Sequence, residues 1–125
     1  MNILKLRHDF GDIIQEYEIL DYKKWQIGFY FKSKASLRDG SFLYIREYVD
    51  EDDKKYAYHW QRANGELIAR WDNAPHHPQL STFPHHKHEG GSPDASKESK
   101  EVSVVEVLTY IRQKTADSGG SANFL

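Results

Sequence analysis

The chain has 125 residues, of which 29% are charged and 38% hydrophobic, and its formal net charge is -2 with neutral histidines. This length supports one hydrophobic core, and the charge is not the basic surplus of a dedicated nucleic-acid-binding protein. The absence of cysteine excludes disulfides, thiolate chemistry and sulfur-ligated zinc, so a metal site would have to use His, Asp and Glu.

No apolar run approaches the roughly 20 residues that a membrane-spanning helix needs. Charged residues such as Lys5 and Arg7 interrupt the N-terminal segment before any apolar region of useful length, so a signal-peptide pattern is missing. We therefore expect a cytoplasmic protein that does not associate with membranes.

The first predicted element is an amphipathic helix over residues 9–20, with its clearest part at 9–17. Asp9 is a suitable N-cap, and His8 would be exposed just before the helix. Four apolar side chains have the i, i+3, i+4, i+7 spacing of one helix face, namely Phe10, Ile13, Ile14 and Tyr17.

Residues 25–72 show the period-two alternation of an antiparallel meander. Asp39-Gly40 and Asn64-Gly65 interrupt the alternation, and these dipeptides are typical of tight hairpin turns because glycine accepts a positive φ. The pattern predicts four strands, at residues 25–37, 42–49, 56–61 and 66–72.

Six of the seven histidines and three of the four prolines lie at or near the segment Arg70–His88. Proline fixes φ and removes a backbone donor, so residues 73–88 are expected to form a semi-rigid arm that is neither helix nor central strand. The polar residues that follow extend this into an arm and flexible loop over residues 73–101.

A capping box at Ser103 and Glu106 predicts a second helix over residues 102–114. Its buried stripe would consist of Val104, Val107, Leu108 and Ile111. Residues 1–114 are thus expected to form a single α+β domain, in which an antiparallel sheet of about four to five strands packs against an N-terminal and a C-terminal helix. Residues 115–125 would be a disordered tail.

The histidines in this segment suggest a nuclease that uses no metal. RNA cleavage through the 2′-hydroxyl needs a base, an acid and a cation for the developing phosphorane charge, and histidine can fill either proton-transfer role near neutral pH. The candidate acid and base groups are His85, His86 and His88, with His76 or His77 as a further candidate. Arg46 and Arg70 would hold phosphate, and Asp72 would orient a histidine. Tyr44, Tyr48 or Trp71 could stack on a base.

Other interpretations of the same residues remain open. A divalent metal such as zinc, nickel or manganese could be bound by nitrogen and oxygen ligands in a metal-dependent hydrolase. The ligands would be Asp72, His76, His86 and His88, with His77 as the alternative to His76. Alternatively the histidines pack beside prolines and satisfy backbone carbonyls, with no chemical role, or the segment docks a protein partner without catalysis.

Several runs of the sequence resemble the TumE-type toxin family of toxin–antitoxin systems, over about residues 5–112. These runs are Leu37–Leu43, Glu47-Tyr48, Tyr58–Trp60, Arg70–Pro78 and Phe83–His88. The resemblance implies a small prokaryotic cytoplasmic toxin, encoded beside an antitoxin that has a helix-turn-helix DNA-binding domain. Many toxins of such systems cleave RNA, so the hypothesis is an endoribonuclease toxin that its antitoxin neutralises by direct binding. An unpaired sheet edge would also permit a homodimer.

Overall fold

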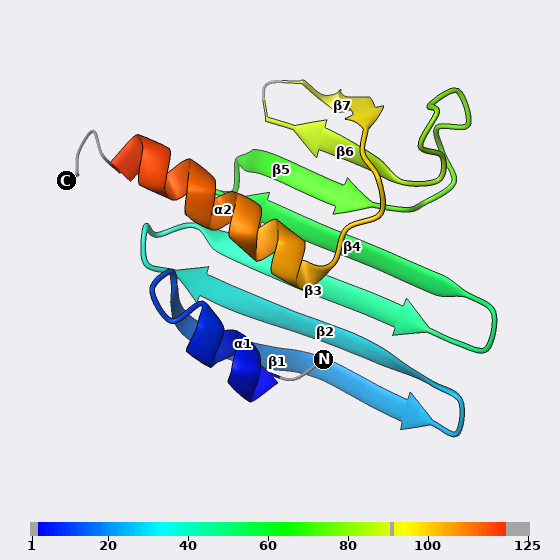
Figure 1. The fold of residues 1–125 in the computed structure, drawn as a ribbon, viewed down its shortest axis with the longest axis horizontal. Coiled ribbons are helices and arrows are strands. Elements are labelled where there is room, and N and C mark those ends of the chain that lie inside the picture. The colour runs from blue at the N-terminus through cyan, green and yellow to red at the C-terminus, as the bar shows by residue number, and fades with distance from the viewer. Residues whose placement is uncertain (1–2, 91, 120–125) are drawn as a thin grey trace.

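The computed structural model describes residues 3–90 and 92–119. Over these residues the chain forms two helices and seven strands (Figure 1). In chain order they are α1 (Ile3–Asp9), β1 (Ile14–Trp25), β2 (Gly28–Leu37), β3 (Phe42–Val49), β4 (Lys54–Gln61), β5 (Leu67–Asp72), β6 (His86–Glu89), β7 (Ser92–Glu98) and α2 (Val104–Gly119).

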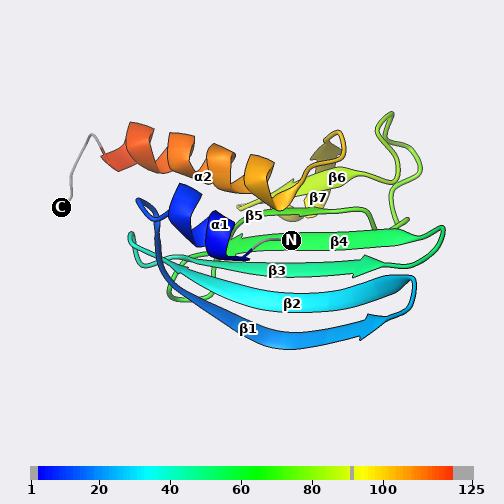
Figure 2. The same ribbon diagram turned by 60° about the horizontal axis from the view of Figure 1, so that its bottom comes forward.

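The seven strands lie in one antiparallel sheet, in the same order as in the chain. Both helices pack on one face of this sheet, and the other face is not covered by a helix of the described residues (Figure 2). The predicted α+β class is confirmed, and the predicted meander corresponds to β2–β5. The prediction of four to five strands was too low, because β1 extends the meander on one side and β6 and β7 extend it on the other.

The core lies between the sheet and the helices. Along β3, Leu43 and Ile45 are fully buried, whereas the residues between them project to the opposite face. The predicted apolar stripe of α2 is confirmed, since all four of its members are buried: Val104, Val107, Leu108 and Ile111.

An arginine joins the C-terminal helix to the N-terminal part of the chain. Arg112 donates from Nη2 to Asp12 Oδ1 at 2.8 Å and to the Asp9 carbonyl at 2.6 Å. Its guanidinium also lies 4.4 Å from the centre of the Phe10 ring. These contacts fix α2 over the end of the sheet at which β1 begins.

The helix predicted over residues 9–20 is wrong. The observed helix α1 ends at Asp9, a turn follows over residues 10–13, and β1 begins at Ile14. Phe10 and Ile14 are buried as the pattern suggested, but the turn brings them together rather than a helix. A short apolar run is compatible with the spacing of a helix and with that of a strand. Here the segment is a strand because β1 pairs with β2 along nearly its whole length.

The arm and flexible loop predicted over residues 73–101 are also only partly correct. Residues 86–89 form β6, which pairs on both sides within the sheet, and β7 follows at Ser92–Glu98. The prolines at 75, 78 and 84 all precede β6, so they do not remove a donor from it.

The ends of the second helix were predicted with mixed success. The capping box is confirmed: Ser103 N–H donates to Glu106 Oε1 at 3.0 Å, and Glu106 N–H donates to Ser103 Oγ at 3.3 Å. The helix extends beyond residue 114 to Gly119, so the predicted disordered tail is wrong for residues 115–119, and the rest of that tail lies outside the described residues.

The two predicted hairpin turns are confirmed, because Gly40 has a φ of 91° and Gly65 has a φ of 93°.

Neither described helix has the length and apolar character that would be needed to cross a membrane.

Candidate functional site

Strand register places two rows of side chains across the face of the sheet that lies away from the helices. Directly paired residues project to the same face, so each row can be followed from strand to strand. One row contains Lys32, Arg46, Ala57, Asp72 and His86. The next row contains Lys34, Tyr44, His59, Arg70 and His88.

The short strand β6 therefore divides the histidine-rich run between the two faces. His86 and His88 lie on the open face beside Asp72 and Arg70. Lys87 projects to the helix face instead, where its ammonium donates to the Tyr110 hydroxyl at 3.1 Å. Alternation along β6 thus places His86 and His88 close enough to act together and keeps Lys87 apart from them.

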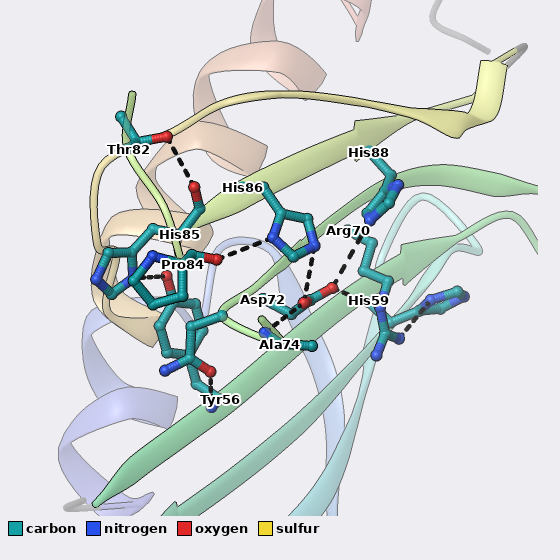
Figure 3. Close-up of polar contacts among 11 residues, drawn as sticks. Tyr56, His59, Arg70, Asp72, Ala74, Thr82, Pro84, His85, His86 and His88 are labelled. Atoms are coloured by element: carbon teal, nitrogen blue, oxygen red, sulfur yellow. Dashed lines mark hydrogen bonds and ion pairs between the residues drawn. The ribbon is translucent and has the colours of Figure 1, made fainter. Parts of the chain in front are cut away.

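Asp72 is the centre of this site (Figure 3). It is only 5% exposed, and its two oxygens accept hydrogen bonds from three groups. Arg70 Nε–H donates to Oδ2 at 3.1 Å, the Ala74 N–H donates to Oδ1 at 2.9 Å, and His86 Nε2 lies 2.9 Å from Oδ1. A buried carboxylate with these partners is a rigid anchor for the histidine beside it.

His86 is 2% exposed and is held at both ring nitrogens. Its Nδ1 lies 3.0 Å from the Pro84 carbonyl oxygen, and its Nε2 faces Asp72. Both neighbours are acceptors, so an imidazolium with two N–H groups satisfies both contacts at once. This geometry fixes the ring in place and makes His86 a support for its neighbours.

Two further histidines surround His86. The ring centres of His77 and His86 are 4.7 Å apart, those of His86 and His88 are 4.9 Å apart, and those of His77 and His88 are 5.7 Å apart. His88 Nε2 also lies 3.9 Å from Asp72 Oδ2. The loop between β5 and β6 therefore brings His77 back over the open face.

The environment lowers the pKa of His77 below the ordinary histidine value. The first cause is desolvation of the ring, and repulsion from His86, His88 and His76 adds to it. The Asp72 carboxylate acts in the opposite direction without cancelling the effect. His77 consequently keeps a neutral ring to lower pH than an ordinary histidine does.

The same three histidines could hold a metal ion. The nearest ligand atoms of His77, His86 and His88 lie within 4.8 Å of one another. The Nδ1–H of His86 points to a backbone carbonyl, which is how metal-binding imidazoles are commonly oriented. To bind an ion, His86 would use Nε2, which lies 2.9 Å from Asp72 Oδ1, so the ion would have to replace that contact. The donor set would then suit zinc or nickel, with His77 rather than His76 as the histidine from the loop.

His59 extends the site along the second row. Its Nδ1 lies 3.3 Å from Arg70 Nη1, which donates to it. Burial lowers the pKa of His59, and the nearby Arg70 charge lowers it further. His59 is thus the second partner of the guanidinium that also contacts Asp72.

Of the other predicted site residues, His85 lies away from the histidine group. It stacks on Tyr56 with ring centres 5.7 Å apart, and its Nδ1 lies 2.8 Å from the Tyr56 hydroxyl. Tyr56 is a core residue, and burial raises the pKa of its hydroxyl to about 12. His76 is exposed in the loop, and Arg46 is exposed in the first row of the open face.

A pocket of about 700 Å³ lies on the open face beside Asp72 and Arg70. Arg46, Arg70 and Asp72 were predicted as site residues from the sequence, and Tyr48 was predicted as a ring that could stack on a base. The pocket is also lined by residues without such a prediction, which include Tyr30, Lys55, Ala57, Pro75 and Phe83. Lys55 pairs with Tyr48 across β3 and β4, but the predicted strand began at residue 56 and left Lys55 out. Phe83 is placed by the fold of the loop, for which the sequence carries no periodic signal.

Comparison with curated proteins and with solved structures gave no match for this chain. A family model described as toxin TumE matches residues 3–115, which include every element of the sheet and most of α2. The resemblance noted in the sequence is thereby confirmed, and the chain belongs to the toxin TumE family.

Proposed function

We propose that this toxin is an endoribonuclease that cleaves RNA without a metal ion. Membership of the toxin TumE family indicates a toxin, and the proposal concerns how it acts. One observation carries it: His77, His86 and His88 gather at the buried Asp72 carboxylate, on a sheet face that also presents arginine and lysine. Groups that can exchange protons near neutral pH thus lie beside groups that attract phosphate.

The proposed reaction uses the 2′-hydroxyl of RNA as the nucleophile. His77 takes the proton of that hydroxyl while its oxygen forms a bond to the adjacent phosphorus. The bond from phosphorus to the 5′-oxygen breaks, and His88 gives its proton to that oxygen. The products are a 2′,3′-cyclic phosphate and a free 5′-hydroxyl.

The pKa of His77 supports its assignment as the base, because a neutral ring must be available to accept a proton. Arg70 is positioned to stabilise the negative charge that develops on the phosphate oxygens. Its Nε is held by Asp72 and its Nη1 by His59, so the guanidinium is oriented before the substrate arrives.

Asp72 and His86 act through their neighbours in this scheme. Both nitrogens of His86 are engaged, so we assign it a positioning role rather than proton transfer. His85, which was a candidate in the sequence, contacts Tyr56 and is left out of the scheme.

The test is cleavage of a single-stranded RNA by the purified toxin, with and without a chelator. We expect His77→Asn and His88→Asn each to lower the rate by about 10²–10⁴, which is the usual contribution of a general acid or base. His8→Asn is a matched control, because this exposed histidine lies on α1. Cleavage that is absent from the wild type, or unchanged in both variants, would contradict the proposal.

The rival function is a metal-dependent hydrolase in which His77, His86 and His88 bind the ion. It predicts that a chelator abolishes cleavage and that zinc or manganese restores it. It also predicts stoichiometric metal in the purified protein, lost in His86→Asn. If metal-free protein cleaves RNA in the presence of a chelator, the metal-dependent hydrolase is ruled out. If the chelator abolishes cleavage and added metal restores it, the metal-free mechanism is ruled out.

The toxin family also implies an antitoxin partner. We propose a helix-turn-helix antitoxin that binds the toxin directly in the cytoplasm, and the long edge strand β1 offers a site for a homodimer. Co-expression with the product of the adjacent gene, followed by size-exclusion chromatography, tests both interactions. If His77→Asn and His88→Asn retain toxicity and antitoxin binding, the toxin acts by docking and not by cleavage.

A further inference from the structure

We propose that the pocket beside Asp72 binds one nucleotide of a single-stranded RNA. Its base would lie against the rings of Tyr48 and Phe83, and its phosphate would contact Arg46. This inference rests on the proposed ribonuclease function, which it extends from a reaction to a mode of substrate recognition.

The pocket exists because of a small residue in a row of large ones. Ala57 lies between Arg46 and Asp72 in the first row of the open face, and all three line the pocket. The rings of Tyr30 and Tyr48 border it from β2 and β3, and Phe83 borders it from the loop between β5 and β6. A volume of about 700 Å³ is within the range of small-molecule sites.

Aromatic rings at the pocket favour a flat ligand. Tyr48 is held in orientation by its hydroxyl, which donates to Asp50 Oδ2 at 3.0 Å, and by the Trp25 ring, whose centre is 5.7 Å away. Phe83 is 44% exposed although it is fully apolar. Single-stranded nucleic acids are commonly bound by stacking unpaired bases on such rings.

The charged side chains at the pocket favour an anion. Four cationic side chains and two carboxylates line it, so positive charge is in excess. Lys55 lies 3.5 Å from Asp53, and Arg70 lies 3.1 Å from Asp72. Arg46 makes no hydrogen bond or ion pair with any other part of the chain that the structure describes, so its guanidinium is available for a phosphate.

The pocket is continuous with the proposed catalytic group. Asp72 and Arg70 line the pocket and also contact His86 and His59. A nucleotide bound there would have its neighbouring phosphodiester beside His77 and His88. Stacking rings and the available guanidinium of Arg46 next to proton-transfer groups fit RNA better than an acidic peptide, whose side chains would not stack on the rings.

The test is fluorescence anisotropy with a fluorescein-labelled 2′-O-methyl hexaribonucleotide, which binds but has no free 2′-hydroxyl to react. We expect Tyr48→Ala and Phe83→Ala each to weaken binding about 5- to 100-fold, the range for loss of one stacked base. Arg46→Ala should reduce the slope of log affinity against log salt by about 0.7, the value for one phosphate contact on a single strand.

A control variant separates loss of the pocket from loss of the fold. Tyr22→Ala removes a ring that is 55% exposed on the helix face and should leave the dissociation constant unchanged. Thermal unfolding of each variant shows whether the fold is intact.

The outcomes for the pocket and for the nuclease can be told apart. The pocket proposal is wrong if Tyr48→Ala, Phe83→Ala and Arg46→Ala all bind the RNA with wild-type affinity. It is also wrong if a base-free sugar–phosphate strand binds equally well, or if a polyglutamate peptide binds more tightly. If RNA is still cleaved in any of these cases, the nuclease proposal remains supported. Binding that depends on Tyr48 and Phe83, without any cleavage, supports the pocket and overturns the nuclease.

Discussion

Among single residues, Asp72 holds the largest number of partners in the histidine site. Replacement by alanine would leave the buried His86 and the half-buried donors of Arg70 and Ala74 without their acceptor. Because removal of one partner from a buried ion pair typically costs 3–5 kcal/mol, we expect Asp72→Ala to lower the free energy of unfolding by about 3–5 kcal/mol. Urea denaturation measures this loss.

Asp53 provides the control for that experiment. Its ion pair with Lys55 is exposed, so Asp53→Ala should change the free energy of unfolding by less than about 1 kcal/mol. Equal losses in the two variants would show that Asp72 is not the anchor that the contacts indicate.

His59 makes stability depend on pH. Its pKa is lowered in the folded protein, so the unfolded chain binds more protons at this residue once the pH falls to the ordinary histidine value of about 6.5. The stability linked to His59 is therefore complete above that pH and is lost as the pH falls toward the lowered pKa. We expect the stability of His59→Gln to decline less than that of the wild type between about pH 7 and about pH 5. Parallel curves from urea denaturation would contradict the assignment.

The sequence could locate this site but could group only two of its histidines. The i, i+2 spacing of His86 and His88 places them on one side of any extended segment, and β6 has this alternation. The position of His77 depends on a loop without periodicity, so only the folded structure could group it with His86.

For secondary-structure elements, the cap of α2 gives a simple prediction. Ser103→Ala removes the hydroxyl that accepts the Glu106 N–H, and we expect a loss of about 1 kcal/mol in the free energy of unfolding. Thr109→Ala, on the exposed face of the same helix, should cause no loss because alanine is the better helix former. Thermal or urea denaturation distinguishes the two, and a Thr109→Ala loss as large as that of Ser103→Ala would refute the cap.

Elements with a strong local signal were predicted well, and elements that depend on distant partners were not. The hairpin turns at Gly40 and Gly65 follow from local backbone geometry, and they fixed the register of β2–β5. By contrast β1 and β7 are the edge strands of the sheet, and β1 has many exposed polar residues and shows little alternation. Their strand conformation comes from pairing with β2 and β6.

Across the whole molecule, one face of the sheet stabilises the fold and the other carries the candidate site. The helix face holds the core, and the open face holds the histidines and the pocket. Ile111→Ala should therefore lower the free energy of unfolding by about 2–5 kcal/mol, since this fully buried side chain leaves a cavity. The RNA affinity of the molecules that remain folded should not change. A large loss of affinity at a temperature where the variant is fully folded would show that the faces are coupled.

The net charge of -2 conceals a local basic region. Along β3, β4 and β5 the open face carries Arg46, Lys55 and Arg70, whereas Glu18 and Asp21 of β1 lie on the same face opposite Lys34 and Lys32. Composition alone argued against nucleic-acid binding, because a sum over the whole chain does not show where the charges lie. Strand register shows that the basic side chains at the pocket lie away from the acidic residues of β1.

The order of the strands has a consequence for synthesis on the ribosome. Each strand pairs with the one before it, so a nascent chain can add hairpins as they emerge, from β1 through β5. Translation must continue through β6 before His86 and His88 can reach Asp72, and α2 closes the core only after that. A prematurely terminated chain that stops before β6 would lack both these histidines and α2, so the proposed nuclease would become active only when its translation is almost complete.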